Sequence, residues 1–250
     1  MCGIIGFTGR KPAKDILIDG LERLEYRGYD SAGIALLNDD DTLTIRKKAG
    51  RVSELRELCK DGDYSSTCGI GHTRWATHGG VTDANAHPHR CGNVALIHNG
   101  IIENYSDIIR EYGLADKLVS ETDSEVVAAL LDTLYDGDPI AAIRKAVKII
   151  AGSFALCIMF ADRPGIIYAV RNVSPMVAAH SEEGSIIASD LTAIISFSKD
   201  YFVVPEYHIL TMTQEGIRVE DLKGNEVKPQ MLEITWDITA AQKGGFPHFM

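Results

Sequence analysis

The sequence predicts an α+β fold with two β-sheets at its centre and helices on the outside. Segments with helical spacing of apolar residues are concentrated in the first part and the middle of the chain, and segments typical of strands occur at both ends. Hydrophobic residues make up 45% of the 250 residues. Two sheets covered by helices would bury this amount of apolar surface. Layered folds routinely reach about 200–250 residues, so one domain is expected.

The N-terminal part of the chain contains apolar runs typical of strands and an amphipathic helix. In 15–25 the apolar residues recur at helical spacing from Ile16 to Leu24, which predicts a helix with one buried stripe. The polar stretch 38–41 separates two strand-like segments, as in a strand pair. The elements expected in this part are a strand at 3–8, a helix at 15–25, paired strands at 31–37 and 42–48, and a short helix at 53–60.

Helical spacing predominates in the middle of the chain, and short strands predominate after Gly152. Turn residues such as Arg163-Pro164-Gly165 divide these later strands. The middle elements expected are strands at 68–75 and 94–98 around a loop at 77–93, then helices at 106–112, 124–135 and 140–150. The C-terminal strands expected are 154–160, 166–170, 176–179, 186–188, 201–204 and 208–213.

Composition and charge exclude several classes of protein. The formal net charge is −10 and no cluster of basic residues offsets it, so nucleic acid is not an expected partner. No apolar run approaches the roughly 18 residues of a membrane span, and the N-terminus does not have the pattern of a secretory signal. The five cysteines are scattered without a CxxC pair, which argues against a disulfide framework. These features predict a cytoplasmic protein.

Cys2 directly follows the initiator methionine. If Met1 is removed, the thiol and a free α-amine lie on the same residue. The amine titrates near about 7.7–8.0, so part of it is an unprotonated base at neutral pH. A nucleophile activated by the N-terminal amine is a known catalytic arrangement. The alternative is a small apolar side chain buried at the start of the first strand.

The segment 72–80, HTRWATHGG, lies at the end of a predicted strand. Arg74 and the hydroxyl of Thr77 can bind a carboxylate, because a guanidinium is a planar donor suited to that group. The pair Gly79-Gly80 would let the loop bend or close over a ligand. The alternative is a surface loop around a buried Trp75.

Two further polar segments have a structural and a functional interpretation. In 26–33, YRGYDSAG, a turn in which Gly28 ends the preceding helix is favoured. In 98–104, HNGIIEN, the side chain of Asn99 and the backbone N–H of Gly100 can form an oxyanion hole. Asn-Gly is equally the commonest two-residue hairpin turn, and spacing does not separate these two interpretations.

The segment 120–125, SETDSE, precedes an apolar helical run. Thr122 and Glu125 have the spacing of a capping box at the start of that helix. Asp123 lies in the first helical turn, where a carboxylate is favourable next to the helix dipole. The functional alternative for Asp123 is a counter-charge for a substrate ammonium.

His87, His89 and Cys91 alternate along the chain and raise the question of a metal. Imidazole and thiolate suit zinc, but a closed site needs a fourth ligand and more usual spacings. Pro88 and the tight alternation fit such a site poorly. We therefore expect neither a metal nor a cofactor.

In their order along the chain, these segments together resemble a known family. The similarity rests on Cys2-Gly3-Ile4, YRGYDSAG, HTRWATHG, NAHPH, HNGIIEN and SETDSE. It points to the glutaminase domain of glutamine–fructose-6-phosphate aminotransferases (isomerising), or glucosamine-6-phosphate synthases, within the class II glutamine amidotransferases. The resemblance runs from Cys2 to the end of the chain and implies that 1–250 is one glutaminase domain. The implied fold is the four-layer α/β/β/α sandwich of N-terminal nucleophile hydrolases.

The resemblance implies which residues carry out the reaction. Cys2, as the processed N-terminus, would be the nucleophile, with its α-amine relaying the proton. Asn99 and Gly100 would stabilise the tetrahedral oxyanion. Arg27 would lie close to the nucleophile and order the site. The thiolate would attack the amide of L-glutamine, ammonia would leave, and water would hydrolyse the thioester to glutamate.

The resemblance also implies how glutamine is bound. Arg74 and Thr77 would hold its α-carboxylate, with His78 nearby. Asp123 would take its α-ammonium. Trp75 would lie in the loop that closes over the substrate. Recognition of glutamine thus needs one cation, one anion and a nucleophile, and the sequence supplies each.

Complete members of the family carry two sugar-isomerase domains, which are absent from this sequence. There the ammonia converts fructose 6-phosphate to glucosamine 6-phosphate, and the full enzyme is expected to be a homodimer. This chain would perform the glutaminase half-reaction alone. A non-catalytic module that senses glutamine or binds a metal is the second hypothesis. Phosphoribosylpyrophosphate-type relatives are the nearest alternative within class II, but Trp75-Ala76-Thr77-His78 and Tyr29-Asp30-Ser31 favour the sugar-phosphate branch.

Overall fold

The computed structural model describes residues 2–62, 64–76 and 79–235, whose strands form two antiparallel β-sheets. In spatial order the eight-stranded sheet contains β14 (Leu232–Glu233), β11 (Asp200–Val203), β9 (Val177–Ser181), β10 (Gly184–Ala188), β1 (Gly3–Gly9), β4 (Cys68–Arg74), β2 (Ser31–Leu37) and β3 (Leu43–Ala49). The six-stranded sheet contains β13 (Gly216–Asp221), β12 (His208–Thr213), β8 (Ile167–Asn172), β7 (Gly152–Phe160), β6 (Val94–Ile102) and β5 (His89–Cys91).

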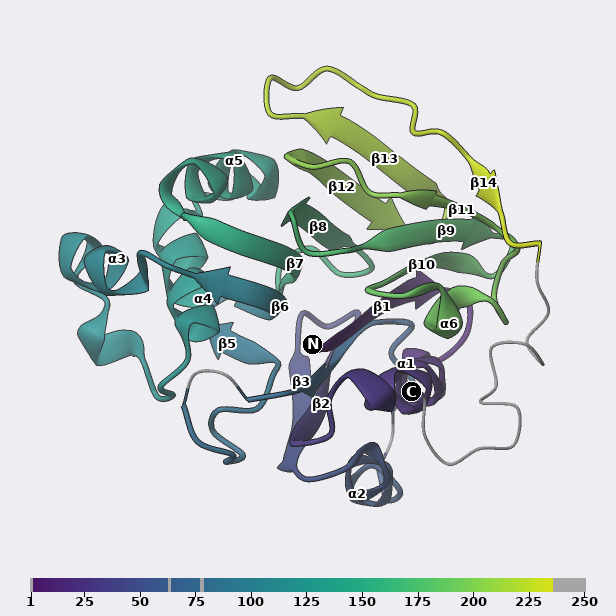
Figure 1. Ribbon diagram of the computed structural model, residues 1–250, viewed down its shortest axis with the longest axis horizontal. Coiled ribbons are helices and arrows are strands. Elements are labelled where there is room, and N and C mark those ends of the chain that lie inside the picture. The colour runs from purple at the N-terminus through teal and green to yellow at the C-terminus, as the bar shows by residue number, and fades with distance from the viewer. Residues whose placement is uncertain (1, 63, 77–78, 236–250) are drawn as a thin grey trace.

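Helices cover the outer faces of the two sheets (Figure 1). On the side of the larger sheet lie α1 (Ala13–Leu24), α2 (Val52–Leu58) and α6 (Leu191–Ile194), and on the side of the smaller sheet lie α3 (Tyr105–Tyr112), α4 (Asp123–Leu134) and α5 (Pro139–Ile149). Short 3₁₀ turns follow α1 and α3, namely η1 (Glu25–Arg27) and η2 (Ala115–Lys117). The expected four-layer α/β/β/α sandwich is confirmed.

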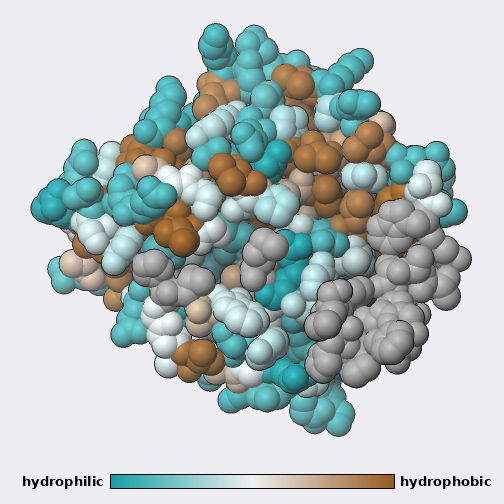
Figure 2. Space-filling model, viewed as in Figure 1, coloured by the Kyte–Doolittle hydropathy of each residue, from teal (hydrophilic) through white to brown (hydrophobic). Residues whose placement is uncertain are grey.

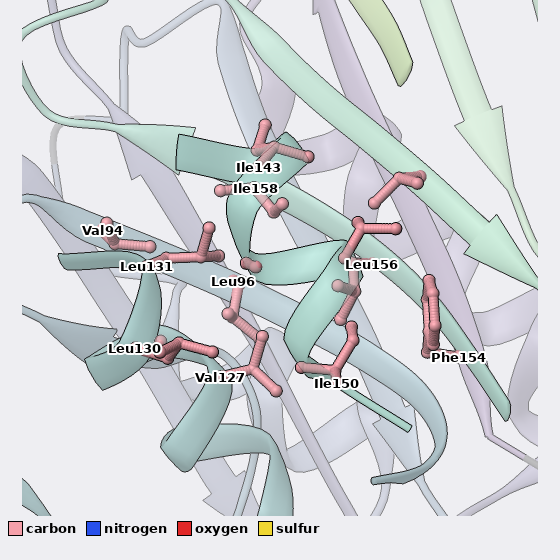
Figure 3. Packing of buried hydrophobic residues seen from close by; sticks show 14 of the residues in the cluster. Val94, Leu96, Val127, Leu130, Leu131, Ile143, Ile150, Phe154, Leu156 and Ile158 are labelled. Carbon is pink, nitrogen blue, oxygen red and sulfur yellow. The ribbon is translucent and has the colours of Figure 1, made fainter. Parts of the chain in front are cut away.

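The hydrophobic core forms three layers that match this arrangement. One cluster lies between α1, α2 and the larger sheet, a second between the two sheets, and a third between the smaller sheet and its helices (Figure 3). Strand β7 shows why. Phe154, Leu156 and Ile158 point to the helix layer, whereas Ala155 and Cys157 point between the sheets, as the two-residue period of a strand requires.

The structure confirms most predicted elements and corrects several. Strand β5 lies inside the segment 77–93 that was expected to be a loop, and β6 continues past His98 to Ile102. Helix α6 and strands β13 and β14 were not predicted. Strand β13 pairs only with β12 at the edge of its sheet, and its charged residues, such as Arg218, hide the alternation typical of a half-buried strand.

The surface is mixed in character. Hydrophilic residues make up most of the outline in Figure 2, and hydrophobic residues lie inside it in separate patches. Within the described ranges, no helix combines the length and the apolar character needed to cross a bilayer.

Three strands bring distant parts of the chain to one place. Gly3 of β1 pairs with Thr73 of β4, so Cys2 lies beside the end of β4. Strand β6 belongs to the other sheet, yet the side chain of Asn99 reaches the Cys2 carbonyl oxygen at 3.0 Å. The candidate site therefore lies where the start of β1 and the end of β4 face β6 of the other sheet.

Candidate active site

Cys2 contacts the backbone of Trp75. The Trp75 N–H donates to Cys2 Sγ at 3.2 Å, and Sγ lies 3.6 Å from the Trp75 carbonyl oxygen, to which the thiol can donate. Burial raises the pKa of the Cys2 thiol, whereas the Trp75 N–H and the nearby Arg74 lower it. The residue is only half-buried, so the structure does not support a purely structural cysteine in the core.

Asn99 and Gly100 lie within β6, so the hairpin-turn interpretation is wrong. Asn99 Nδ2 donates to the Cys2 carbonyl oxygen at 3.0 Å, which turns its donor end toward the nucleophile candidate. Gly100 pairs with Phe154 of β7 and has φ +133°, a conformation that favours glycine. A Cβ at position 100 would also overlap the Ser153 carbonyl oxygen, so the backbone here requires glycine.

Arg74 is buried at the end of β4, near both Cys2 and Asp123. Burial lowers the pKa of the Arg74 guanidinium, whereas Cys2, Asp30 and Asp123 raise it through their charges. Its Nη1 donates to the Gly80 carbonyl oxygen at 3.1 Å. The Arg74 guanidinium thus lies within electrostatic range of both the Cys2 thiol and the Asp123 carboxylate.

Asp123 is the first residue of α4, directly after the cap. Thr122 Oγ1 accepts from the Glu125 N–H at 3.3 Å, which confirms the cap, but the Glu125 carboxylate accepts from the Val119 and Ser120 N–H groups instead of closing the box. Asp123 Oδ2 accepts from the Ile102 N–H at 2.7 Å and so joins α4 to the end of β6. The buried Asp123 carboxylate is therefore held by its place in the first turn of α4 and by its hydrogen bond to β6.

The loop after β4 carries Trp75, whose side chain is 46% exposed. The structural alternative for this segment was a surface loop around a buried Trp75, and the burial of Trp75 expected there is wrong. The Asp30 carboxylate accepts from the Ala76 N–H at 2.8 Å, and the Trp75 ring meets Tyr29 edge to face at 5.5 Å. Gly28 was expected to end the first helix, but α1 ends at Leu24 and Gly28 ends η1 instead. A Cβ at Gly28 would come within 2.8 Å of the Arg74 backbone, so glycine permits this close approach.

Arg27 is buried and forms an ion pair with Asp190 at 2.8 Å. Asp190 also accepts from the Tyr26 hydroxyl at 2.8 Å and caps α6 through the Thr192 N–H at 2.9 Å. Arg27 thereby joins η1 to the start of α6. Its expected closeness to Cys2 stays a prediction.

Thr77 and His78 lie outside the described residues, so their expected contacts with substrate stay predictions. Gly79 and Gly80, which follow them, are described. Arg74 Nη2 donates to the Gly79 carbonyl oxygen at 3.4 Å. Asn85 and Glu121 anchor Gly80, because Asn85 Nδ2 donates to its carbonyl oxygen at 3.0 Å and Glu121 accepts from its N–H at 3.3 Å.

Buried histidines lie behind the site. The ring of His87 stacks on His72 at 4.1 Å and meets His89 edge to face at 4.5 Å. Burial lowers the pKa of each of these three imidazoles, that of His72 to about 3, so they are neutral at neutral pH. Cys91 faces Asp132 instead of these rings. Among the described residues no group of histidine, cysteine and acidic side chains is arranged to hold a metal ion.

Sequence reasoning missed several residues that shape the site. Each of them forms a hydrogen bond to a predicted site residue or to the loop that follows β4. They are Asp30, His72, Asn85, Glu121 and Asp190. The first four lie inside the motifs that were recognised, so their polar character in those segments was the available signal. Asp190 had only the signal of a helix cap before α6.

The fold and the sequence both resemble known proteins. A solved glutamine phosphoribosylpyrophosphate amidotransferase from B. subtilis superimposes with a TM-score of 0.77 over 90% of this chain and 50% of that chain, at 24% identity. A glutamine–fructose-6-phosphate aminotransferase (isomerizing) from Clostridium tetani is 42% identical over 100% of this chain and 41% of its own length. One from Thermus thermophilus is 43% identical over 100% of this chain and 42% of its own length.

The chain thus spans about two fifths of the curated relatives that it matches. The family model of the glutamine amidotransferase domain matches residues 72–196, which include β4, β6 and α4 with the candidate residues on them. Half of the chain falls within that match. This chain belongs to the glutamine amidotransferase domain family.

Proposed function

We propose that this chain hydrolyses L-glutamine to glutamate and ammonia, with Cys2 as the nucleophile. One observation carries the proposal: Asn99 Nδ2 donates to the backbone carbonyl oxygen of Cys2, which brings an amide donor to the residue that carries the half-buried thiol. The nearby charges of Arg74 and Asp123 match the two charged groups of a free amino acid.

The reaction proceeds in two steps, formation of a thioester and its hydrolysis, and the side-chain amide carbon of glutamine becomes tetrahedral in each. Removal of Met1 exposes the α-amine of Cys2, which takes the thiol proton as sulfur attacks the side-chain amide carbon of glutamine. The carbonyl electrons move to oxygen, and donors from Asn99 and Gly100 stabilise that oxyanion. The C–N bond then breaks and ammonia leaves with the proton. Water then attacks the resulting thioester and gives a proton to the α-amine. The C–S bond breaks, the sulfur takes that proton back as a thiol, and glutamate departs.

The other proposed residues bind and enclose the substrate. Arg74 and Thr77 hold the α-carboxylate with His78 nearby, and Asp123 binds the α-ammonium. Trp75, half-exposed beside the thiol, covers the bound glutamine. Arg27 orders the site from behind through its ion pair with Asp190. No cofactor or metal is needed for any of these steps.

An assay of the chain with L-glutamine tests the proposal directly. Glutamate and ammonia are expected to form in equal amounts, from protein whose intact mass shows that Met1 has been removed. L-Asparagine, which is one methylene shorter, and N-acetyl-L-glutamine, which lacks the ammonium, are expected to be poor substrates. Calorimetric binding of glutamine without turnover, or stoichiometric zinc, would instead support the sensing or metal-binding module.

Replacement of Asp123 with asparagine is expected to weaken glutamine binding. The asparagine side-chain oxygen can still accept from the Ile102 N–H, so the helix and strand stay joined, but the charge opposite the ammonium is lost. A hydrogen bond to a charged group contributes about 1.5–3 kcal/mol, so KM for glutamine is expected to rise roughly 10- to 100-fold.

Steady-state kinetics measure KM for glutamine in Asp123→Asn and in Asp107→Asn, which is the matched control. Asp107 undergoes the same change of charge on α3, where it pairs with Arg110 at the surface. The Asp107 variant is expected to keep the original KM. If Asp123→Asn also leaves KM unchanged, Asp123 has only a structural role at the start of α4.

We further propose that this glutaminase acts within a longer enzyme. The names of the relatives mention glutamine and fructose 6-phosphate, which supports a reaction in which the ammonia is transferred to fructose 6-phosphate. Glucosamine 6-phosphate would be the product. Two sugar-isomerase domains would supply that site, residues 1–250 would form one glutaminase domain, and the full enzyme would be a homodimer. The five free cysteines are consistent with a reducing cytoplasm.

A further inference from the structure

The two ends of the Asn99 amide have different partners. Nδ2 donates to the Cys2 carbonyl oxygen at 3.0 Å, and Oδ1 lies 3.0 Å from Nε2 of His72. The two orientations of an asparagine amide have nearly the same shape, so hydrogen-bond partners decide which one is adopted. Only the present orientation offers N–H donors on the side of Cys2. The reversed amide would present an oxygen, which repels an oxyanion.

The second contact of His72 decides which of its atoms carries hydrogen. Nε2 of His72 also lies 3.0 Å from the carbonyl oxygen of His98. A carbonyl oxygen only accepts, so Nε2 must be the protonated nitrogen of the ring. An N–H at this place requires an acceptor from Asn99, which is Oδ1. The neighbouring His98 backbone therefore determines the His72 tautomer, and the tautomer determines the direction of the Asn99 amide.

His72 is firmly placed for this purpose. It lies in the middle of the larger sheet, where β4 pairs with β1 on one side and β2 on the other. Its side chain is 1% exposed, and its ring stacks on His87 with an interplanar angle of 17°. Burial keeps the imidazole neutral, because its pKa falls to about 3, so the Nε2 donor does not change over the working pH range.

We propose that His72 is a positioning residue of the glutaminase reaction, which aims the Asn99 amide at the oxygen of the substrate amide through its Nε2–H. The inference rests on the proposed function of this site. His72 acts only through Asn99, so its contribution to turnover cannot exceed that of Asn99 itself.

The test compares His72→Met with His72→Gln in the glutaminase assay. Methionine has about the length of histidine but no donor, whereas the glutamine amide nitrogen can donate to both acceptors. A neutral hydrogen bond contributes about 0.5–1.5 kcal/mol, so His72→Met is expected to lower kcat by up to about tenfold with KM little changed. His72→Gln is expected to retain most of the activity. His72→Phe replaces the methionine variant if that protein does not fold.

A double-mutant cycle with Asn99→Ala separates positioning from general destabilisation. In the Asn99→Ala background, His72→Met is expected to cause no further loss of kcat, because the group that it orients is gone. His89→Met is the matched control. It removes another buried histidine, which contacts Thr122 instead of Asn99, so its effect on kcat is expected to be the same in both backgrounds.

Three results would overturn the inference while the wild-type chain remains an active glutaminase. The first is an unchanged kcat in His72→Met. The second is an equal loss of kcat in His72→Met and His72→Gln. The third is that His72→Met lowers kcat by the same factor in the Asn99→Ala background as in the wild type. Failure of the proposed function is a different outcome, because the wild-type chain would then release no glutamate.

Discussion

Replacement of Cys2 with alanine is expected to reduce the release of glutamate from glutamine to background. No thioester can form without the sulfur, and loss of the nucleophile in a comparable hydrolase costs on the order of 10⁶ in turnover. Alanine keeps the backbone contacts of the strand and removes only the contacts between Sγ and Trp75. Glutamine should therefore still bind, which calorimetry can measure alongside the activity assay.

Cys91→Ala is the matched control for this experiment. Cys91 is the other half-buried thiol of the chain, on β5 and facing Asp132. Its loss is expected to leave the glutaminase rate unchanged. Substantial activity in Cys2→Ala would remove Cys2 from the chemistry.

The state of Met1 belongs to the same prediction, because the α-amine of Cys2 is the proposed base. Protein that retains Met1 has the thiol without that base and is expected to be nearly inactive until it is processed. Intact mass measured on the assayed sample distinguishes the two forms. Full activity with Met1 retained would contradict the mechanism based on the N-terminal amine.

Asn99→Ala is expected to lower kcat by about 10²–10³ with little change in KM. Loss of one oxyanion donor has this effect in other acyl-transfer enzymes, since the donor acts mainly on the charge that develops in the transition state. Asn99→Asp tests the same point with a side chain of equal size. Its carboxylate cannot donate and adds a negative charge, so it is expected to be at least as impaired as the alanine variant.

Thermal unfolding of both Asn99 variants provides the control for folding, because Asn99 also joins β6 to Cys2. A loss of kcat much below tenfold in folded Asn99→Ala would reduce Asn99 to a structural contact between the two sheets.

The sequence was sufficient for helices α1 to α5 and for most of the strands, because the period of the apolar residues is a local property. The helix at 124–135 and the cap at Thr122 are good examples, since their signals lie within a few residues of each other. The predicted end of the strand at His98 was wrong for the opposite reason. The pair Asn99-Gly100 favours a turn locally, but pairing with β7 on one side continues the strand through it.

The supporting residues of the site could not be predicted for a similar reason. His72 and Asn99 are 27 positions apart and belong to different sheets, so no pattern along the chain indicates that they touch. Asp190 is 163 positions from Arg27. The residues quoted in the motifs are the ones that the family resemblance could supply, whereas the partners that fix their orientation follow only from the packing of the layers.

The division of the site between the two sheets links catalysis to the completion of folding. Cys2 and Arg74 belong to one sheet and Asn99 to the other, and the apolar layer between the sheets sets the distance between them. A chain in which only one sheet has formed holds either the thiol or the amide, but not both together. In the proposed reaction such a chain would not hydrolyse glutamine, because the nucleophile and the oxyanion donor would not yet lie together.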